Sequence, residues 1–206
     1  PNCAWPSSRV VPRRSSIQHK PYEGLGGCVN KLVALRCHPE EVHLNTNKLT
    51  KAINSKLWIQ LLPAKGTTKI FPGNLLPKGS GIVLSSGGSS GGPYQCLHPF
   101  SNLNESAIAT GDWLQKQGFK PKDCVIFNPL PLHHVSGLMP WWRSRVWQTE
   151  HIGLPPSIMR NPITLNKFCQ SIFNKRNGPL ILSLVPTHIE RLIKHPAGLE
   201  WLKIFD

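Results

Sequence analysis

Three short apolar runs alternate with longer segments of helical periodicity in the second part of the chain. The runs are GIVLSS at 81–86, DCVIF at 123–127 and LILSL at 180–184. Runs this short and this apolar are typical of strands that are buried on both faces. Consecutive strands that are separated by helices pair in parallel, because the helix returns the chain to the same edge of the sheet. The pattern therefore predicts an α/β fold, in which helices flank a mostly parallel sheet.

Four segments carry helical signals. In the first, the side chains of Leu103, Ala107, Ile108 and Leu114 fall on one stripe, and Gly118 follows as a C-terminal cap. The last segment opens with a proline, which fits the first turn of a helix. We expect helices at four places: from Asn102 or Asn104 to about Gln117, over 137–147, over 165–175, and from Pro186 onwards.

The N-terminal part is less regular. Residues 1–24 are rich in Pro, Ser and Arg and lack periodicity, so we expect a poorly ordered segment there. A helix that includes Leu49 and Leu57 is expected next, and the Pro/Gly-rich stretch 63–80 is expected to be a loop. The chain is thus predicted to consist of an N-terminal tail and one domain over 25–206.

The chain is strongly basic, with a net charge of +14 from 24 Lys and Arg and 10 Asp and Glu. The excess is spread along the chain, and basic residues are adjacent only at Arg13–Arg14 and Lys175–Arg176. A dispersed charge attracts any polyanion, and neither a zinc finger nor an aromatic RNA-binding motif is present. We therefore expect a nucleotide as the anionic partner and do not expect nucleic acid.

The sequence also bears on the cellular compartment. No apolar stretch approaches the ~18 to 20 residues that a membrane-spanning helix needs, and no secretory leader is found, so we expect no membrane span. The six cysteines are widely spaced, lack a Cys-x-x-Cys pair, and in part lie in apolar surroundings. Buried, reduced thiols are the expected state, which indicates the cytoplasm.

Glycines and serines fill the segment SSGGSSGGP at 85–93, directly after the first apolar run. Such a loop exposes backbone N–H groups and hydroxyls that can surround a phosphate. A flexible linker is the alternative, although linkers seldom lie between a strand and a helix that begins about ten residues later. Pro93 and Tyr94 stand where a Walker A motif requires Lys and Ser or Thr, and no Gly-x-Gly-x-x-Gly opens a helix. The loop is therefore predicted to bind phosphate outside both of these classes.

Three segments together resemble the acyl-adenylate-forming (AMP-binding) enzymes. S-G-G-S-S-G-G-P is similar to the phosphate-binding motif of that family, usually written S-G-T-T-G-x-P-K. N-P-L-P-L-H-H-V-S-G-L-M at 128–139 is similar to its P-L-x-H-V-x-G-L segment, and V-P-T-H-I-E-R-L at 185–192 to its V-P-T-x-L-x-R-L segment. The motifs occur in the family's order over about 80–206. Within the family they most resemble the 2-succinylbenzoate–CoA ligases of the menaquinone/phylloquinone pathway, particularly the cyanobacterial type.

The resemblance implies an acid–thiol ligase with ATP, Mg²⁺ and CoA as cofactors. A small carboxylate would attack the α-phosphate of ATP to give an acyl-adenylate, and the CoA thiol would then displace AMP. Both steps need charge neutralisation at phosphoryl oxygens. The expected site residues are the phosphate-binding Gly87, Gly88, Ser89, Ser90 and Gly91, the catalytic and substrate-binding His134, and the substrate-binding Ser136 and Gly137. His133 lies at a position that the family motif leaves variable.

Two departures from the family pattern affect this expectation. Tyr94 occupies the position of the loop's usual Lys or Arg, so a cation is missing there, and His98 is a possible substitute. The chain also ends at Asp206, where the family's next strand begins, so the Mg²⁺ and ribose ligands would lie beyond its end and no metal ligand is assigned. We therefore expect an N-terminal fragment of the AMP-binding domain that lacks turnover alone.

Two other hypotheses remain open from the sequence. A basic module that binds a phosphorylated partner or nucleic acid would also explain the charge and the Gly/Ser loop. A decayed, non-functional copy would explain the unplaced residues 1–24 and Tyr94. The sequence does not determine the oligomeric state.

Overall fold

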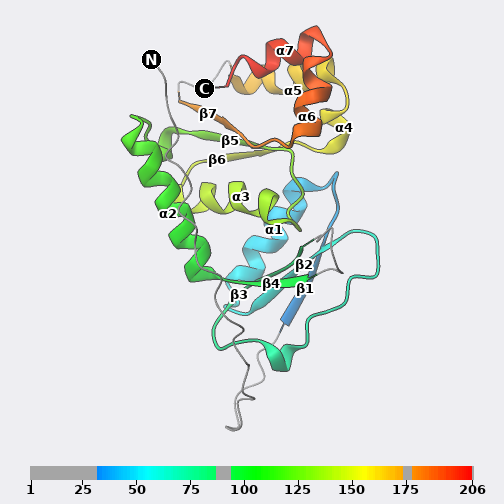
Figure 1. Ribbon diagram of the computed structural model, residues 1–206, viewed down its shortest axis with the longest axis vertical. Coiled ribbons are helices and arrows are strands. Elements are labelled where there is room, and N and C mark those ends of the chain that lie inside the picture. The colour runs from blue at the N-terminus through cyan, green and yellow to red at the C-terminus, as the bar shows by residue number, and fades with distance from the viewer. Residues whose placement is uncertain (1–31, 87–93, 174–177, 206) are drawn as a thin grey trace, which may run out of the picture.

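The computed structural model describes residues 32–86, 94–173 and 178–205. These residues form two β-sheets with helices between and beside them (Figure 1). The strands are β1 (Leu32–Cys37), β2 (Trp58–Pro63), β3 (Gly81–Ser86), β4 (Tyr94–Pro99), β5 (Val125–Asn128), β6 (Glu150–Gly153) and β7 (Leu180–Leu182). The α-helices are α1 (Val42–Ile53), α2 (Phe100–Lys116), α3 (Val135–Trp147), α4 (Pro156–Met159), α5 (Pro162–Phe173), α6 (Pro186–Ile193) and α7 (Pro196–Leu202), and two 3₁₀ turns are Gly73–Leu75 and Pro121–Asp123.

The first sheet has the strand order β1-β2-β3-β4, and the second has the order β6-β5-β7. All pairs are parallel except β3 with β4. The predicted α/β fold with mostly parallel pairing and flanking helices is confirmed. The strands, however, form two sheets, and Figure 1 shows α1 and α3 between them, with α5, α6 and α7 beyond the second sheet.

Two hydrophobic clusters explain why the layers hold together. Between the sheets, Ile59 and Leu61 of β2 pack with Leu138 and Trp141 of α3 in a core whose members are almost fully buried. Beyond the second sheet, Trp201 of α7 is fully buried with residues of β5, α5 and α6. Burial of apolar area on this scale is the main driving force for such layers.

The outer face of the first sheet packs against the 63–80 connection, as predicted mostly loop. The Gln60 side chain holds this connection in place, because its Nε2 donates to the Lys69 carbonyl at 2.9 Å and its Oε1 accepts from Phe71 N at 2.8 Å. Gln60 is completely buried, so both polar ends of its amide need these partners. Trp58 packs on the same face and donates Nε1 to the Pro77 carbonyl.

Helix α2 differs from its prediction in its first residue and in which side chains form its buried stripe. It begins at Phe100, directly after Pro99, so neither Asn102 nor Asn104 caps it. Asn104 instead accepts a hydrogen bond from Trp142 Nε1 on α3 at 2.9 Å. Ile108 is 51% exposed, and Gly111 takes the inward position because the Trp147 indole lies against it. Gly118 has φ +90°, as expected of a C-terminal cap.

The remaining expectations are met in part. The helices predicted at 137–147 and 165–175 are α3 and α5, each beginning slightly earlier, and α6 begins at Pro186 as predicted. The first helix ends at Ile53, and Lys56 in the left-handed region separates it from β2, so Leu57 lies outside the helix. The predicted disorder of residues 1–24 falls outside the described residues.

The cysteine and membrane expectations can be compared with the described residues. Cys37, Cys96 and Cys169 are free thiols, and Cys37, Cys124 and Cys169 are buried. Cys3 and Cys28 lie outside the described residues. Within the described ranges, every helix is too short or too polar to cross a lipid bilayer.

Candidate functional site

The carboxyl ends of strands from both sheets meet at one cavity of about 380 Å³. β1 ends there at Cys37, and the segments that follow β5, β6 and β7 contribute Pro129, Leu154 and Val185. Open α/β folds bind ligands outside the carboxyl ends of their strands, so this strand-end cavity is the natural candidate site. Its lining is formed by Cys37, His38, Pro39, Val42, Asn45, Pro129, Leu130, Pro131, Leu132, His133, His134, Ser136, Leu154, Pro156, Val185 and His188.

The buried side chain of Asn128 connects the segments next to this cavity. This side chain is 2% exposed and has three polar neighbours. Nδ2 donates to the Gly137 carbonyl at 2.8 Å and lies 3.1 Å from His151 Nε2, while Oδ1 accepts from Leu130 N at 3.0 Å. These contacts join β5, β6, the 129–134 turn and the start of α3. The position of the predicted histidine motif therefore depends on one buried amide.

The structure brings two of the predicted substrate-site residues to the cavity. His134 and Ser136 line it, and both side chains are exposed. His134 is also the residue that precedes α3, and its carbonyl accepts from Gly137 N and Leu138 N. Gly137 does not reach the cavity. It is buried beneath the turn, where a Cβ would lie 2.2 Å from the Pro131 carbonyl oxygen.

His133 is more enclosed than its neighbour. Its Nδ1 is buried without a hydrogen-bond partner, and its ring centroid lies 4.4 Å from that of His134. Burial, with a smaller contribution from the His134 charge, lowers the pKa of His133 to about 4. His133 is therefore neutral at pH 7 and presents an uncharged ring to the cavity.

Sequence reasoning missed two contributors to this cavity. His188 on α6 lines it, has a buried and unpartnered Nδ1, and has a pKa lowered by burial and by Arg191. Its signal was present in the V-P-T-H segment, but only the fold places α6 opposite the 129–134 turn. Cys37 enters from β1, and burial, partly offset by Lys48, raises the pKa of its thiol to about 11. The thiol is therefore protonated at neutral pH.

The predicted phosphate-binding residues Gly87, Gly88, Ser89, Ser90 and Gly91 lie outside the described residues. The flanking strands are described, and Ser86 pairs with Tyr94 in antiparallel register. The segment therefore connects two paired strands, and the helix that was expected about ten residues later is α2, which begins at Phe100 directly after β4. Tyr94 itself is 63% exposed.

A second cavity, of about 520 Å³, lies beside the ends of β3 and β4 from which this connection leaves, at the foot of the Gly/Ser segment. The residues that line it, each with a polar side chain, are Thr67, Thr68, Lys69, Ser85 and Gln95. Ser85 Oγ is buried without a partner, and Gln95 Nε2 donates to the Lys69 carbonyl at 2.6 Å. Hydroxyls, an amide and an ammonium group suit a phosphate. Lys69 was not predicted from the sequence, since it reaches this place only through the fold of the 63–80 connection.

No group of three or more His, Cys, Asp and Glu within the described ranges is arranged to hold a metal ion. We therefore assign no Mg²⁺ ligand among the described residues.

Acidification is expected to destabilise the protein through its neutral histidines. Burial lowers the pKa of His151 to about 4, and its Nε2 accepts from Asn128, so protonation would bring two donors together. As the pH falls, the histidine of the unfolded chain is protonated near pH 6.5, whereas that of the folded chain is protonated only near pH 4. The contribution of His151 to stability is therefore present above pH 6.5 and is lost as the pH falls towards 4. Between pH 7 and pH 5 we expect a loss of about 2 kcal/mol from His151, measured by urea unfolding. His151→Gln, which keeps an acceptor but cannot titrate, should show a smaller dependence, and an unchanged dependence would contradict this assignment.

Comparisons with known proteins were made for the sequence and for the fold. Neither a protein-family model nor a curated protein matches the sequence. Among solved structures, malonyl-CoA ligase in a ternary product complex with methylmalonyl-CoA and AMP is 14% identical, with a TM-score of 0.54 over 86% of this chain and 45% of that chain. o-Succinylbenzoate CoA synthetase (MenE) from Bacillus subtilis, in complex with the acyl-adenylate intermediate OSB-AMP, is 12% identical, with a TM-score of 0.47 over 80% and 51%. ATP-bound MatB from Rhodopseudomonas palustris is 18% identical, with a TM-score of 0.44 over 80% and 32%.

The fold of this chain is thus the fold of part of malonyl-CoA ligase, which confirms the predicted fold class. The chain spans about half or less of the length of these three structures. At these identities the likeness concerns the fold, and the activity is a separate question.

Proposed function

We propose that this chain is part of an ATP-dependent acid–CoA ligase, which adenylates a small carboxylate and transfers the acyl group to CoA. We further propose 2-succinylbenzoate as the acid, within menaquinone or phylloquinone biosynthesis. ATP, Mg²⁺ and CoA are the cofactors of this proposal, and the cytoplasm, suggested by the free thiols, is its location. Turnover would require more of the enzyme than this chain.

One observation carries the proposal. The 129–134 and 185–188 segments, which were selected by motif alone, line one cavity at the carboxyl ends of parallel strands. They do so within a fold shared with malonyl-CoA ligase, whose structure holds methylmalonyl-CoA and AMP. Unrelated segments with chance motif matches have no reason to converge at one ligand-binding position.

The residues suggest a division of roles between the two cavities. In the strand-end cavity, exposed His134 would orient the reacting carboxylate, and neutral His133 and His188 would offer uncharged hydrogen-bonding groups. At the foot of the Gly/Ser segment, Lys69 would supply the cation that Tyr94 does not. Charge neutralisation and positioning are the main requirements of phosphoryl chemistry.

Acid-dependent exchange of pyrophosphate into ATP, measured on the full gene product, tests the proposal. We expect exchange with 2-succinylbenzoate and not with fatty acids. His134→Ala should reduce it at least about 10-fold, because positioning of the reacting group is lost. The matched control is His43→Ala, which removes a histidine that is exposed and does not line the cavity. Exchange with fatty acids alone would reassign the substrate, and absence of exchange with any acid would refute the ligase proposal.

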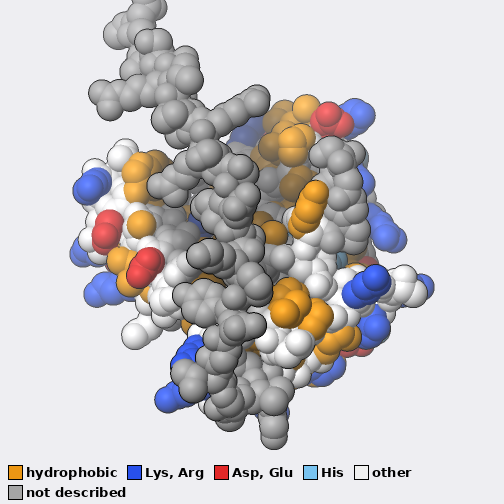
Figure 2. Space-filling model, turned by 60° about the horizontal axis from the view of Figure 1, so that its bottom comes forward, with side chains coloured by type: hydrophobic (Ala, Val, Ile, Leu, Met, Phe, Trp, Pro, Cys, Tyr) orange, Lys and Arg blue, Asp and Glu red, His pale blue; other side chains and the backbone are white. Residues whose placement is uncertain are grey.

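A binding module for a phosphorylated partner is the second candidate, favoured by the net charge of +14. In Figure 2, the Lys and Arg side chains of the described residues are dispersed around one face of the molecule. Nucleic-acid interfaces usually cluster their basic side chains, so this dispersal favours a small anionic ligand. Salt-sensitive binding of polyanions without any acid-dependent exchange would support the module.

A further inference from the structure

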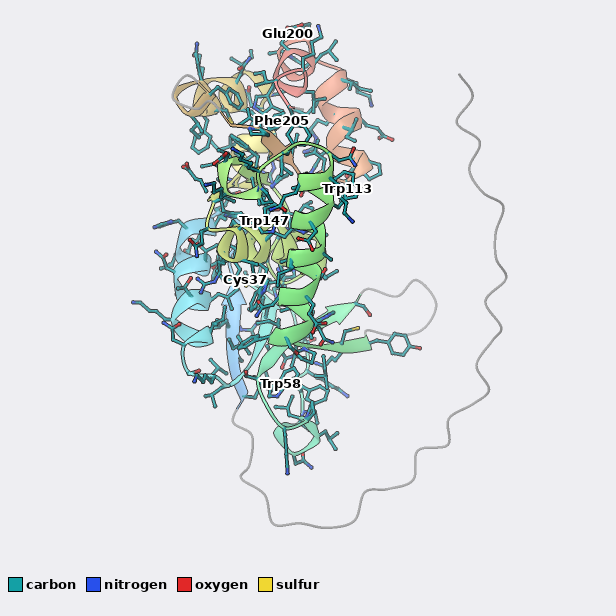
Figure 3. The ribbon with its side chains drawn as sticks, turned by 90° about the vertical axis from the view of Figure 1, so that its left-hand side faces the viewer. Cys37, Trp58, Trp113, Trp147, Glu200 and Phe205 are labelled. Atoms are coloured by element: carbon teal, nitrogen blue, oxygen red, sulfur yellow. The ribbon has the colours of Figure 1, made fainter. Side chains whose placement is uncertain are left out.

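A separate cavity of about 360 Å³ lies between α2, α3 and the β5–β7 pair. Figure 3 views the molecule from the side on which two of its residues, Trp113 of α2 and Trp147 of α3, are labelled. Its volume is within the range of small-molecule sites, which is roughly 300 to 1,000 Å³. The walls are mainly apolar and include Trp113, Leu114, Phe119, Ile126, Trp147 and Ile181.

One cation lies among these apolar walls. Arg143 of α3 lines the cavity, and its Nε is buried without a hydrogen-bond partner. Arg145, on the same helix, is exposed and has partners for its guanidinium group. It donates to Thr50 Oγ1 at 3.2 Å, and its Cζ lies 5.1 Å from the centre of the Trp141 ring. The folded chain thus satisfies Arg145 and leaves Arg143 with an unused donor.

A guanidinium N–H that is buried without a partner is unfavourable, because this donor loses water without gaining an acceptor. None of the described residues that line the cavity is an aspartate or a glutamate. A carboxylate is the complement of an Arg fork, and indole and phenyl walls suit a flat apolar body. We propose that this cavity binds a small organic carboxylate with an aromatic or similarly flat apolar body.

This site is distinct from the strand-end cavity. Residues of α3 line both cavities, but Ser136 lines the strand-end cavity and Arg143 lines this one. These two residues are seven positions apart, which in a helix corresponds to roughly 10 Å. Among the described residues, none lines both cavities. The inference therefore does not depend on the ligase proposal, and its test needs no enzymatic activity.

Calorimetric titration of the 206-residue chain with 2-naphthoate tests the inference directly. We expect binding of one equivalent with a Kd on the order of 0.1 mM. Arg143→Gln should weaken binding at least about 10-fold, since the charge-assisted contact is lost. Arg145→Gln removes the same charge from the same helix and should leave the Kd within about twofold. Uncharged 2-naphthalenemethanol should bind the wild-type chain at least about 10-fold more weakly than 2-naphthoate does.

A blocking variant keeps the test decisive if Arg143→Gln does not fold. Ser183→Phe introduces a ring at a residue that lines the cavity and leaves Arg143 in place, so it should abolish binding. Far-UV circular dichroism checks that each variant is folded. Binding that folded Arg143→Gln or Ser183→Phe retains in full, or no binding by the folded wild-type chain, overturns the proposal. Loss of naphthoate binding in His134→Ala would assign the ligand to the strand-end cavity and overturn it as well.

Discussion

The Asn128→Ala variant is expected to lose about 3 kcal/mol of unfolding free energy. The side chain is 2% exposed, and it connects the Gly137 carbonyl, the His151 ring and the Leu130 N–H. Alanine would leave these groups without their partner in a place that water does not readily enter. Each buried polar group left unpaired costs about 1 to 3 kcal/mol, and the vacated volume adds a smaller cavity cost.

Urea unfolding of the wild-type and variant chains measures this loss. Asn47→Ala is the matched control, because Asn47 is exposed and its one side-chain contact is with His43 on the same helix. We expect the control to change stability by less than about 0.5 kcal/mol. A loss below about 1 kcal/mol in Asn128→Ala would show that the amide is not the contact that connects the segments next to the strand-end cavity.

The same substitution should also affect ligand binding. Asn128 fixes Leu130 and Gly137, and the turn between them carries His133 and His134. Without the amide this turn loses two of its attachments to the second sheet. We therefore expect pyrophosphate exchange by the full gene product to fall together with stability in Asn128→Ala, whereas Asn47→Ala should alter neither property.

The three strands at the centre of the prediction were found because they are almost purely apolar. β3 and β5 are buried along most of their length, and burial on both faces gives a sequence signal that needs no neighbours. β4 and β6, with sequences YQCLHP and EHIG, gave no such signal, since their residues are mostly half-buried or polar. They are strands because β3 and β5 offer them unpaired edges, and pairing of this kind overrides local propensity.

The site was predictable to a similar extent. His134 and Ser136 follow a buried strand along the chain, so a sequence argument could place them at the end of that strand. His188 and Lys69 come from segments that are distant in sequence. Lys69 reaches the foot of the Gly/Ser segment because two glutamines, Gln60 and Gln95, donate to its carbonyl. Contacts between such distant positions are a property of the folded chain, and a single sequence does not encode them as a local pattern.

The motif predicts that Gly137 is a substrate-binding residue, and the structure gives this glycine a packing role as well. It is buried within α3, directly beneath the turn that lines the strand-end cavity, and is not itself among the lining residues. A Cβ there would lie 2.2 Å from the Pro131 carbonyl oxygen and 2.5 Å from that of Leu130. Both atoms belong to the backbone, so no side-chain rotation relieves the contact. The glycine is therefore required for the close approach of α3 to the histidine turn.

We therefore expect Gly137→Ala to lower the free energy of unfolding, although the same substitution usually stabilises a helix. Within a helix, alanine in place of glycine normally stabilises by about 1 kcal/mol. Here the new methyl group must displace the turn that carries His133 and His134, and we expect a net loss of roughly 3 kcal/mol, at the upper end of the cost of overpacking. Urea unfolding measures the loss, and Ser136→Ala, at the adjacent exposed position, should stay within about 0.5 kcal/mol of the wild type. Stabilisation by Gly137→Ala would mean that the turn can move away from α3, in which case the helix would not fix the positions of the two histidines.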